Sequence, residues 1–291
     1  MNSDPEDAVE TPPEKAFAAV GDETRIEILR ALAQDLNEPV SFSELRDRVG
    51  VRDSGQFNYH LGKLQGRFVR KTDEGYTTTY AGRHLSGAIL AGTYTESGAI
   101  DPIELDDSCP MCGEPVAVRY EDERVHISCT ECDEFRNEFS MPPGVVDGRD
   151  RDALPETFDR WLRLNVERIV AGFCTACEGP TTPSFDRIDD ELAVVYECER
   201  CGDHLQADPA GVVLSHPAVV SFYYDHGVDV RREPLWRLLG PNYGELKDLT
   251  RVVEEDPLRV RISFERDGDR LHLVLDEDAE VVEVDRTSAD A

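Results

Sequence analysis

Residues 53–80 of the chain read DSGQFNYHLGKLQGRFVRKTDEGYTTTY, and this stretch decides the fold of the N-terminal part. Asp53 with Gln56 three residues later is typical of a helix start, because each side chain can satisfy a free backbone amide of the first turn. Apolar residues then recur at helical spacing, at Phe57, Leu61 and Leu64. Two runs of aromatic, β-branched and basic residues follow around a polar turn. The pattern predicts a helix over 54–65 and a two-stranded hairpin over 68–80.

The flanking residues extend this pattern in both directions. Upstream, Asp22 is a good N-cap for a longer helix, and Ser41 with Glu44 forms a capping box that opens a shorter one. Downstream, apolar residues at helical spacing predict a further helix. Helix, short helix, turn, helix, hairpin and helix is the order of a winged helix-turn-helix, which predicts such a domain over residues 12–95. The acidic residues 1–11 are expected to form a mobile tail.

Three runs within this region carry a family resemblance: FAAVGDETRIEILRAL at 17–32, DSGQFNYHLGKL at 53–64 and RFVRKTDEGYTTTYAGR at 67–83. They resemble the first helices, the recognition helix and the wing of the ArsR-like transcriptional regulators. The resemblance covers residues 14–93, about a quarter of the chain. It implies a protein that binds double-stranded DNA with its recognition helix in the major groove and its wing on the backbone.

The resemblance also bears on assembly and sensing. Most relatives bind pseudo-palindromic sites as dimers, which implies a homodimer through Ala16 to Val20 and Leu85 to Leu90. The metal-sensing relatives place cysteine ligands in the winged domain. In this chain no cysteine precedes Cys109, so the resemblance leaves the sensed signal open.

The recognition-helix pattern leaves a set of polar residues away from the apolar face. Amides suit adenine and long basic side chains suit guanine, so these residues are candidates for base contacts. The candidates in the groove are Gln56, Asn58, Tyr59 and Lys63, with Arg52 at the turn and Arg70 and Lys71 in the wing touching the backbone. For Asn58 a structural hydrogen bond is an equal alternative, and His60 is better read as a core or boundary residue.

The charge of the chain is compatible with DNA as a partner. Of 291 residues, 61 are acidic and 31 basic, so 61 − 31 leaves a net charge of −30. The basic residues are 27 Arg and 4 Lys, which together with the acid excess resembles proteins of salt-accumulating archaea. At about 1 M salt the Debye length is only about 3 Å, so the net charge exerts almost no long-range field. Residues 41–90 also carry eight basic against five acidic residues, a local charge of +3.

The N-terminus and the hydropathy pattern predict a cytoplasmic protein without a membrane partner. MNSDPEDAVE is acidic where a signal peptide would be basic and then apolar. The longest apolar stretches fall short of the roughly 18 residues that a membrane helix needs.

All eight cysteines fall in one pattern that is used twice. Each unit has two Cys-x2-Cys pairs, separated by sixteen residues in the first unit and by twenty in the second: Cys109, Cys112, Cys129 and Cys132, then Cys174, Cys177, Cys198 and Cys201. This spacing predicts two zinc ions per chain, each held by four thiolates. Disulfides are the alternative, disfavoured in a reducing cytosol. A closed four-thiolate shell has no position for water or substrate, which favours a structural over a catalytic role.

The segments around the cysteines predict two zinc ribbons, each followed by a helix, over 106–173 and 174–240. A similar pentapeptide follows each ribbon, Pro142-Pro143-Gly144-Val145-Val146 in the first unit and Pro209-Ala210-Gly211-Val212-Val213 in the second. Helices are expected after them, over 156–173 and 218–239. A duplicated module is one interpretation, and chance similarity around two ribbons is the other. Residues 241–291 predict a short helix after Gly240-Pro241 and then an antiparallel β-meander with strands over 258–265, 270–275 and 280–284. The fold class is therefore expected to be α+β.

These features favour a sequence-specific transcriptional regulator, with the zinc ribbons structural or sensory. A winged domain with a zinc ribbon also resembles the archaeal general factor that helps RNA polymerase open promoters. That alternative acts on the transcription machinery and needs no operator, but the second ribbon and the long C-terminal region depart from it. No Ser/His/Asp set, phosphate loop or paired-carboxylate motif stands out, so no enzyme is predicted, although a nucleic-acid-modifying activity stays open.

Overall fold

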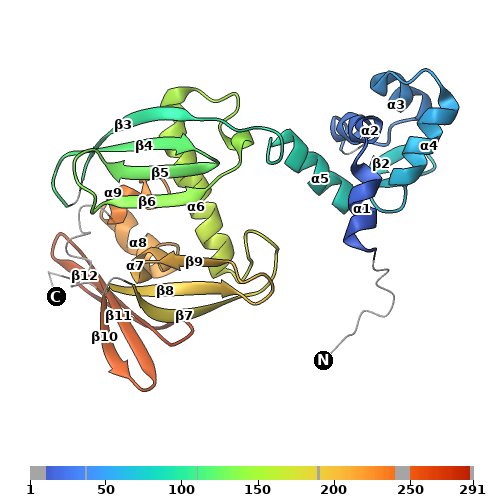
Figure 1. Ribbon diagram of the computed structural model, residues 1–291. Helices are drawn as coiled ribbons and strands as arrows, with labels where there is room; N and C mark the ends of the chain where they lie inside the picture. The colour runs from blue at the N-terminus through green and yellow to red at the C-terminus, as the bar shows by residue number, and fades with distance from the viewer. Residues whose placement is uncertain (1–10, 37, 110, 189–190, 240–249, 289–291) are drawn as a thin grey trace. The chain divides into compact units, whose positions relative to one another are not determined.

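The computed structural model describes residues 11–36, 38–109, 111–188, 191–239 and 250–288, apart from the side chains of residues 237 and 239 (Figure 1). The chain has a mixed α+β fold that divides into two compact units. Unit 1 comprises Met1–Ser97 and Pro142–Val145, and unit 2 comprises Gly98–Met141 and Val146–Ala291. The expected acidic tail, up to residue 10, and the expected short helix after Gly240 lie outside the described residues. Among the described helices, none is both long and apolar enough to span a bilayer.

The described part of unit 1 up to Ser97 contains five α-helices and one small sheet, and several of the helices start at local caps. The elements are α1 Pro13–Val20, α2 Glu23–Ala33, α3 Phe42–Val49, α4 Ser54–Leu64, β1 Val69–Lys71, β2 Tyr76–Thr78 and α5 Tyr80–Leu90. The side chains of Asp22, Ser41 and Asp53 accept hydrogen bonds from first-turn amides, which confirms the three predicted helix starts. The second hairpin strand is shorter than expected, because Thr79 caps α5 and Tyr80 is already helical.

The core of unit 1 gathers apolar residues from the predicted faces of α2, α3 and α4. Ile28, Leu29, Leu45, Phe57 and Leu61 are all fully buried. Their burial leaves the other face of α4 exposed to solvent. The apolar residues that recur at helical spacing in the sequence are therefore the residues that these helices bury in the core.

Two glycines of α5 differ in what surrounds them, although both are poor helix residues by propensity. A Cβ added at Gly82 would lie 2.0 Å from the carbonyl oxygen of Phe68, whereas one added at Gly87 would have no atom within 4 Å. We expect Gly82→Ala to destabilise the protein by about 1–3 kcal/mol through overpacking. Gly87→Ala, the matched control, should stabilise it by up to about 1 kcal/mol. Urea unfolding followed by circular dichroism measures both, and equal effects would contradict the prediction.

Unit 2 begins with a four-stranded antiparallel sheet in the order β3-β4-β5-β6. Its strands are β3 Ile100–Ser108, β4 Pro115–Glu121, β5 Arg124–Cys129 and β6 Arg136–Ser140. The sequence predicted the two central strands, over Val116 to Tyr120 and Arg124 to Ser128, but neither β3 nor β6. The strand β3 contains Pro102 and four acidic residues and pairs irregularly. Pro and charge are tolerated there since β3 is an edge strand.

A long helix and a second antiparallel sheet follow. The helix α6 Leu154–Val170 starts two residues before the predicted position and ends three residues earlier, and β7 Thr181–Ile188, β8 Glu191–Cys198 and β9 His204–Ala207 form the sheet β7-β8-β9. Ile169 of α6 packs with Val194 and Tyr196 of β8 and with Val212. This small cluster joins the helix to the second sheet.

The single helix predicted over 218–239 is wrong. The structure has two shorter helices there, α8 Pro217–Asp225 and α9 Leu235–Leu239, and α7 Pro209–Val212 comes before them. The chain leaves the helical path at Gly227, which adopts φ +75°, and Pro234 precedes the last helix. Apolar residues recur at nearly helical spacing across this break, which is why the periodicity suggested one helix.

The C-terminal sheet is an antiparallel meander of four strands rather than the predicted three. They are β10 Thr250–Glu255, β11 Leu258–Arg266, β12 Asp269–Leu275 and β13 Val281–Thr287. One face buries Val260, Ile262 and Phe264 with Phe222 and Tyr223 of α8. The alternation in β11 predicted this half-buried face. The strand β10 escaped prediction because its residues are mostly polar and exposed.

Candidate functional site

The eight cysteines converge into two clusters of four, as their spacing predicted. In each cluster all four sulfur atoms lie within 4.8 Å of one another. In the first cluster the Sγ atoms of Cys109 and Cys132 are 3.7 Å apart and those of Cys112 and Cys129 are 3.4 Å apart. The second cluster repeats these values, with 3.7 Å between Cys174 and Cys201 and 3.4 Å between Cys177 and Cys198.

These separations fit a shared metal ion and not a disulfide. A disulfide bond is about 2.05 Å long, and all eight cysteines are free. Around a tetrahedral ion with metal–sulfur bonds of about 2.3 Å, neighbouring sulfurs lie about 3.8 Å apart. Each cluster therefore has the ligand type, number and spacing to hold one metal ion.

The thiol pKa values show why these clusters need a cation. The backbone amide of Cys201 lowers the pKa of Cys198 to about 6, and that of Cys132 lowers the pKa of Cys129 to about 7. At Cys112 the Glu114 amide lowers the pKa, but burial and the neighbouring thiols outweigh it and raise the pKa to about 12. One thiolate thus forms readily in each cluster, and further thiolates need a positive ion among them.

Tight backbone turns hold the sulfurs in position. After the Cys109 pair, Gly113 adopts φ +83° and donates its amide to the Cys109 carbonyl at 2.8 Å. After the Cys198 pair, Gly202 adopts φ +72° and bonds the Cys198 carbonyl at 2.9 Å. The glycines permit this left-handed turn, which returns the second sulfur to the side of the first. The local sequence of each of these turns therefore determines where two of the four sulfurs of its cluster lie.

A second group of candidates lies on unit 1. All seven residues predicted to touch DNA are exposed on α4, on the turn before it and on β1: Arg52, Gln56, Asn58, Tyr59, Lys63, Arg70 and Lys71. Tyr59 is 61% exposed, and the Lys63 ammonium lies 5.3 Å from the centre of its ring. The structure therefore leaves this face of the helix and hairpin open to a ligand.

The basic residues of this face differ from four of the other arginines of unit 1. Arg25, Arg30, Arg46 and Arg48 each pair with a carboxylate. Among the described residues, no carboxylate pairs with Arg52, Lys63, Arg70 or Lys71. Arg67, which the sequence analysis did not select, is likewise exposed and without an acidic partner in the part described. Its position directly before the hairpin was the signal available in the sequence. In a chain with twice as many acidic as basic residues, these basic side chains without acidic partners form a surface that we call the cationic surface: Arg52, Lys63, Arg67, Arg70 and Lys71.

For two polar residues near this surface, Asn58 and His60, the sequence left more than one role open. Asn58 is exposed, and its side chain bonds to none of the described residues. Within the described part of the chain, the structural hydrogen bond considered for it is not made. His60 is a boundary residue: its side chain is 12% exposed, and its Nδ1 lies 3.2 Å from Asp22 in a geometry that does not meet hydrogen-bond criteria.

Comparison with known proteins gives the family but no activity. A family model described as a domain of unknown function, DUF7351, matches residues 106–281, which is more than half of the chain. A second, DUF7347, also described as a domain of unknown function, matches residues 13–89. No curated protein matches the chain significantly. The match to DUF7351 contains both four-cysteine clusters. Because this match covers more than half of the chain, the chain belongs to the DUF7351 family.

Proposed function

We propose that the protein is a sequence-specific, DNA-binding transcriptional regulator whose unit 1 is an ArsR-like winged helix-turn-helix. In this assignment α4 is the recognition helix in the major groove, and the β1–β2 hairpin is the wing on the backbone. The observation that carries the proposal is the cationic surface, where Arg52, Lys63, Arg70 and Lys71 are exposed and lack carboxylate partners in the described part. Cations that are not used within the protein are available for phosphates and base edges.

Two further features support this assignment. The order of helices and strands in unit 1 is the order expected for a winged domain. Phe17 on α1 and Leu90 on α5 are 72% and 59% exposed, which suits a homodimer formed through these helices. A two-fold symmetric dimer reads a pseudo-palindromic operator, with its two half-sites one or more helical turns apart.

Each four-cysteine cluster is assigned one structural zinc ion. The donor set is four soft thiolates in tetrahedral spacing, which zinc prefers and which leaves no position for water or substrate. The ions would then stabilise both ribbons, and most of all the β7-β8-β9 sheet, whose described strands bury few apolar residues besides the cysteines, Val194 and Tyr196. Elemental analysis of the purified chain should find two zinc ions per chain.

In the first test, the full chain selects binding sites from random duplex DNA in about 2 M KCl. At this salt concentration the contribution of phosphate contacts to the binding affinity is suppressed. We expect enrichment of one pseudo-symmetric site. Gln56→Ala with Lys63→Ala should weaken binding to that site about 10- to 100-fold, because two base contacts are lost. The double variant should bind unrelated DNA nearly as well as the wild type does.

The control is Glu27→Gln with Arg30→Gln, which changes one ion pair on α2, outside the cationic surface. This variant should keep the selected site and its affinity. If no site is enriched, and the wild type and the Gln56/Lys63 variant behave alike, the regulator assignment is wrong. The general-factor alternative, acting on RNA polymerase without an operator, would then be the better reading.

A further inference from the structure

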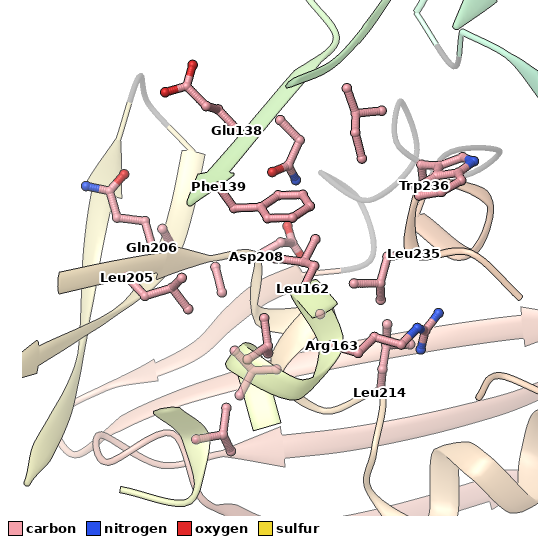
Figure 2. A pocket seen from close by; sticks show the side chains of 18 of the residues that line it. Glu138, Phe139, Leu162, Arg163, Leu205, Gln206, Asp208, Leu214, Leu235 and Trp236 are labelled. Atoms are coloured by element: carbon pink, nitrogen blue, oxygen red, sulfur yellow. The ribbon is translucent and has the colours of Figure 1, made fainter. Parts of the chain in front are cut away.

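A cavity of about 1240 Å³ in unit 2 is bordered by two sheet edges (Figure 2). β6 is the last strand of the first sheet and β9 is the last strand of the second. The cavity is lined by the consecutive residues Glu134 to Phe139 and again by Leu205 to Asp208. Successive side chains of a strand point to opposite faces, so a consecutive run means that the cavity meets each strand at its edge.

The hydrogen-bond register shows which groups of β6 point into the cavity. Phe135 bonds to Cys129 and Met141 bonds to Glu123, at either end of the β5–β6 ladder. In an antiparallel pair every second residue bonds to the partner strand, so the alternate residues Arg136 and Glu138 direct their amide and carbonyl outward. Within the described chain, no group bonds these outward amides and carbonyls.

The same register argument applies to β9. Asp203 bonds to Cys198, which places Leu205 and Ala207 in the bonded positions of the β8–β9 ladder. Gln206 between them therefore directs its amide and carbonyl outward, and they too lack a partner among the described residues. Two sheet edges with unused backbone groups thus border one cavity.

The rest of the cavity wall mixes apolar and charged side chains, and hydrogen bonds hold parts of it in place. Leu162 and Val166 of α6, with Val212 and Leu214, form apolar parts of the lining, and Phe139 projects into the space in Figure 2. Trp161 of α6 donates to the Ser140 carbonyl at 3.0 Å, which covers the end of β6. Trp236 donates to Asp107 of β3 at 2.7 Å. These bonds tie α6 and α9 to the first sheet, so the two edges border a defined space.

We propose that this cavity binds an extended segment of a partner protein, which adds as a strand to the edges of β6 and β9. The backbone of the segment would bond the outward groups of Arg136 and Glu138 on one side and of Gln206 on the other. Its apolar side chains, at alternate positions, would face Leu162, Val166 and Val212. This goes beyond DNA binding, because it gives unit 2 a protein partner.

The dimensions and the chemistry favour a polypeptide over a small molecule. Ligand pockets for small molecules usually measure about 300–1,000 Å³, and this cavity is larger. Alternating amides and carbonyls along a sheet edge match the backbone of another strand, as in other cases of strand addition. Unpaired edges also promote aggregation unless they are covered, so a partner strand gives these edges a role.

The experiment is selection from a phage-displayed library of random ten-residue peptides against the full, metal-loaded chain. Binding of the enriched peptides is then measured by fluorescence anisotropy. We expect peptides with apolar residues at alternate positions. Glu138→Pro and Gln206→Pro each remove one outward amide and leave the ladder bonds in place, so each should weaken binding about tenfold. Glu138→Ala and Gln206→Ala remove the same side chains but keep the amide, and should stay within about threefold.

A second measurement does not depend on how the proline variants fold. The peptide with N-methyl groups at alternate backbone positions should lose binding to the wild type, and the unmodified peptide should slow hydrogen exchange at Arg136, Glu138 and Gln206. The proposal is wrong if no peptide is enriched, if the N-methylated peptide binds equally well, or if the protected amides lie elsewhere. It is also wrong if these edges pair with a second copy of the chain, shown by a wild-type dimer that the proline variants abolish.

Discussion

Replacing Cys198 with serine is expected to remove one of the two metal ions and to unfold the β7-β8-β9 sheet. Cys198 is the last residue of β8, its sulfur lies 3.4 Å from that of Cys177, and only 2% of the residue is exposed. Binding of structural zinc by a four-ligand site contributes roughly 10–16 kcal/mol of folding free energy in small domains. The sheet has too small a core to replace this contribution, since Val194 and Tyr196 are its buried apolar residues besides the cysteines.

The measurement is metal content by mass spectrometry, with hydrogen exchange to locate the unfolded segment. The metal content should fall from two ions to one, and exchange should rise across residues 181–207. Cys112→Ser is the matched variant in the first cluster, and it should instead affect residues 115–140. Thr182→Ala, which removes a side-chain hydrogen bond to Glu199 on the same sheet, is the control and should retain both ions. Two ions retained by Cys198→Ser would contradict the metal assignment.

Asp159→Ala is expected to cost about 3–5 kcal/mol of stability, because it leaves the largely buried Arg163 without its only carboxylate partner among the described residues. Asp159 lies on α6 with 5% of its side chain exposed, and its carboxylate accepts from Arg163 Nε at 2.7 Å. The other carboxylate oxygen accepts from the amide of Leu235, also at 2.7 Å. Arg163 donates in addition to the carbonyls of Val230 and Glu233. The pair therefore fastens the segment before α9 to α6.

The same helix provides a matched control for this prediction. Glu156 and Arg160 form an ion pair with the same i,i+4 spacing, but their side chains are 63% and 68% exposed. Glu156→Ala should cost no more than about 0.5 kcal/mol, because solvent screens an exposed pair. Chemical unfolding of unit 2, followed by tryptophan fluorescence, measures both variants. If the two substitutions have similar effects, burial is not what makes the Asp159–Arg163 pair important.

The sequence by itself determined the features that depend on neighbouring residues. The N-caps at Asp22, Ser41 and Asp53 were predictable because a cap is a bond between residues two or three positions apart. The metal ligands were predictable for the same reason, since each Cys-x2-Cys turn places its own two sulfurs on one side. The apolar face of α4 and the alternation in β11 followed from helical and strand periodicity.

Only the tertiary structure decided the features that depend on distant residues. The strand β3 contains Pro102, and it forms because β4 supplies its partners. The helix expected over 218–239 is broken at Gly227. This residue follows α8, which packs against β12. The sequence did not show that β6 and β9 border one cavity, because their placement depends on α6, which bonds to Ser140 of the first sheet and to Thr181 of the second. Local patterns specify capping, periodicity and metal turns, whereas packing between distant segments specifies which edges remain free.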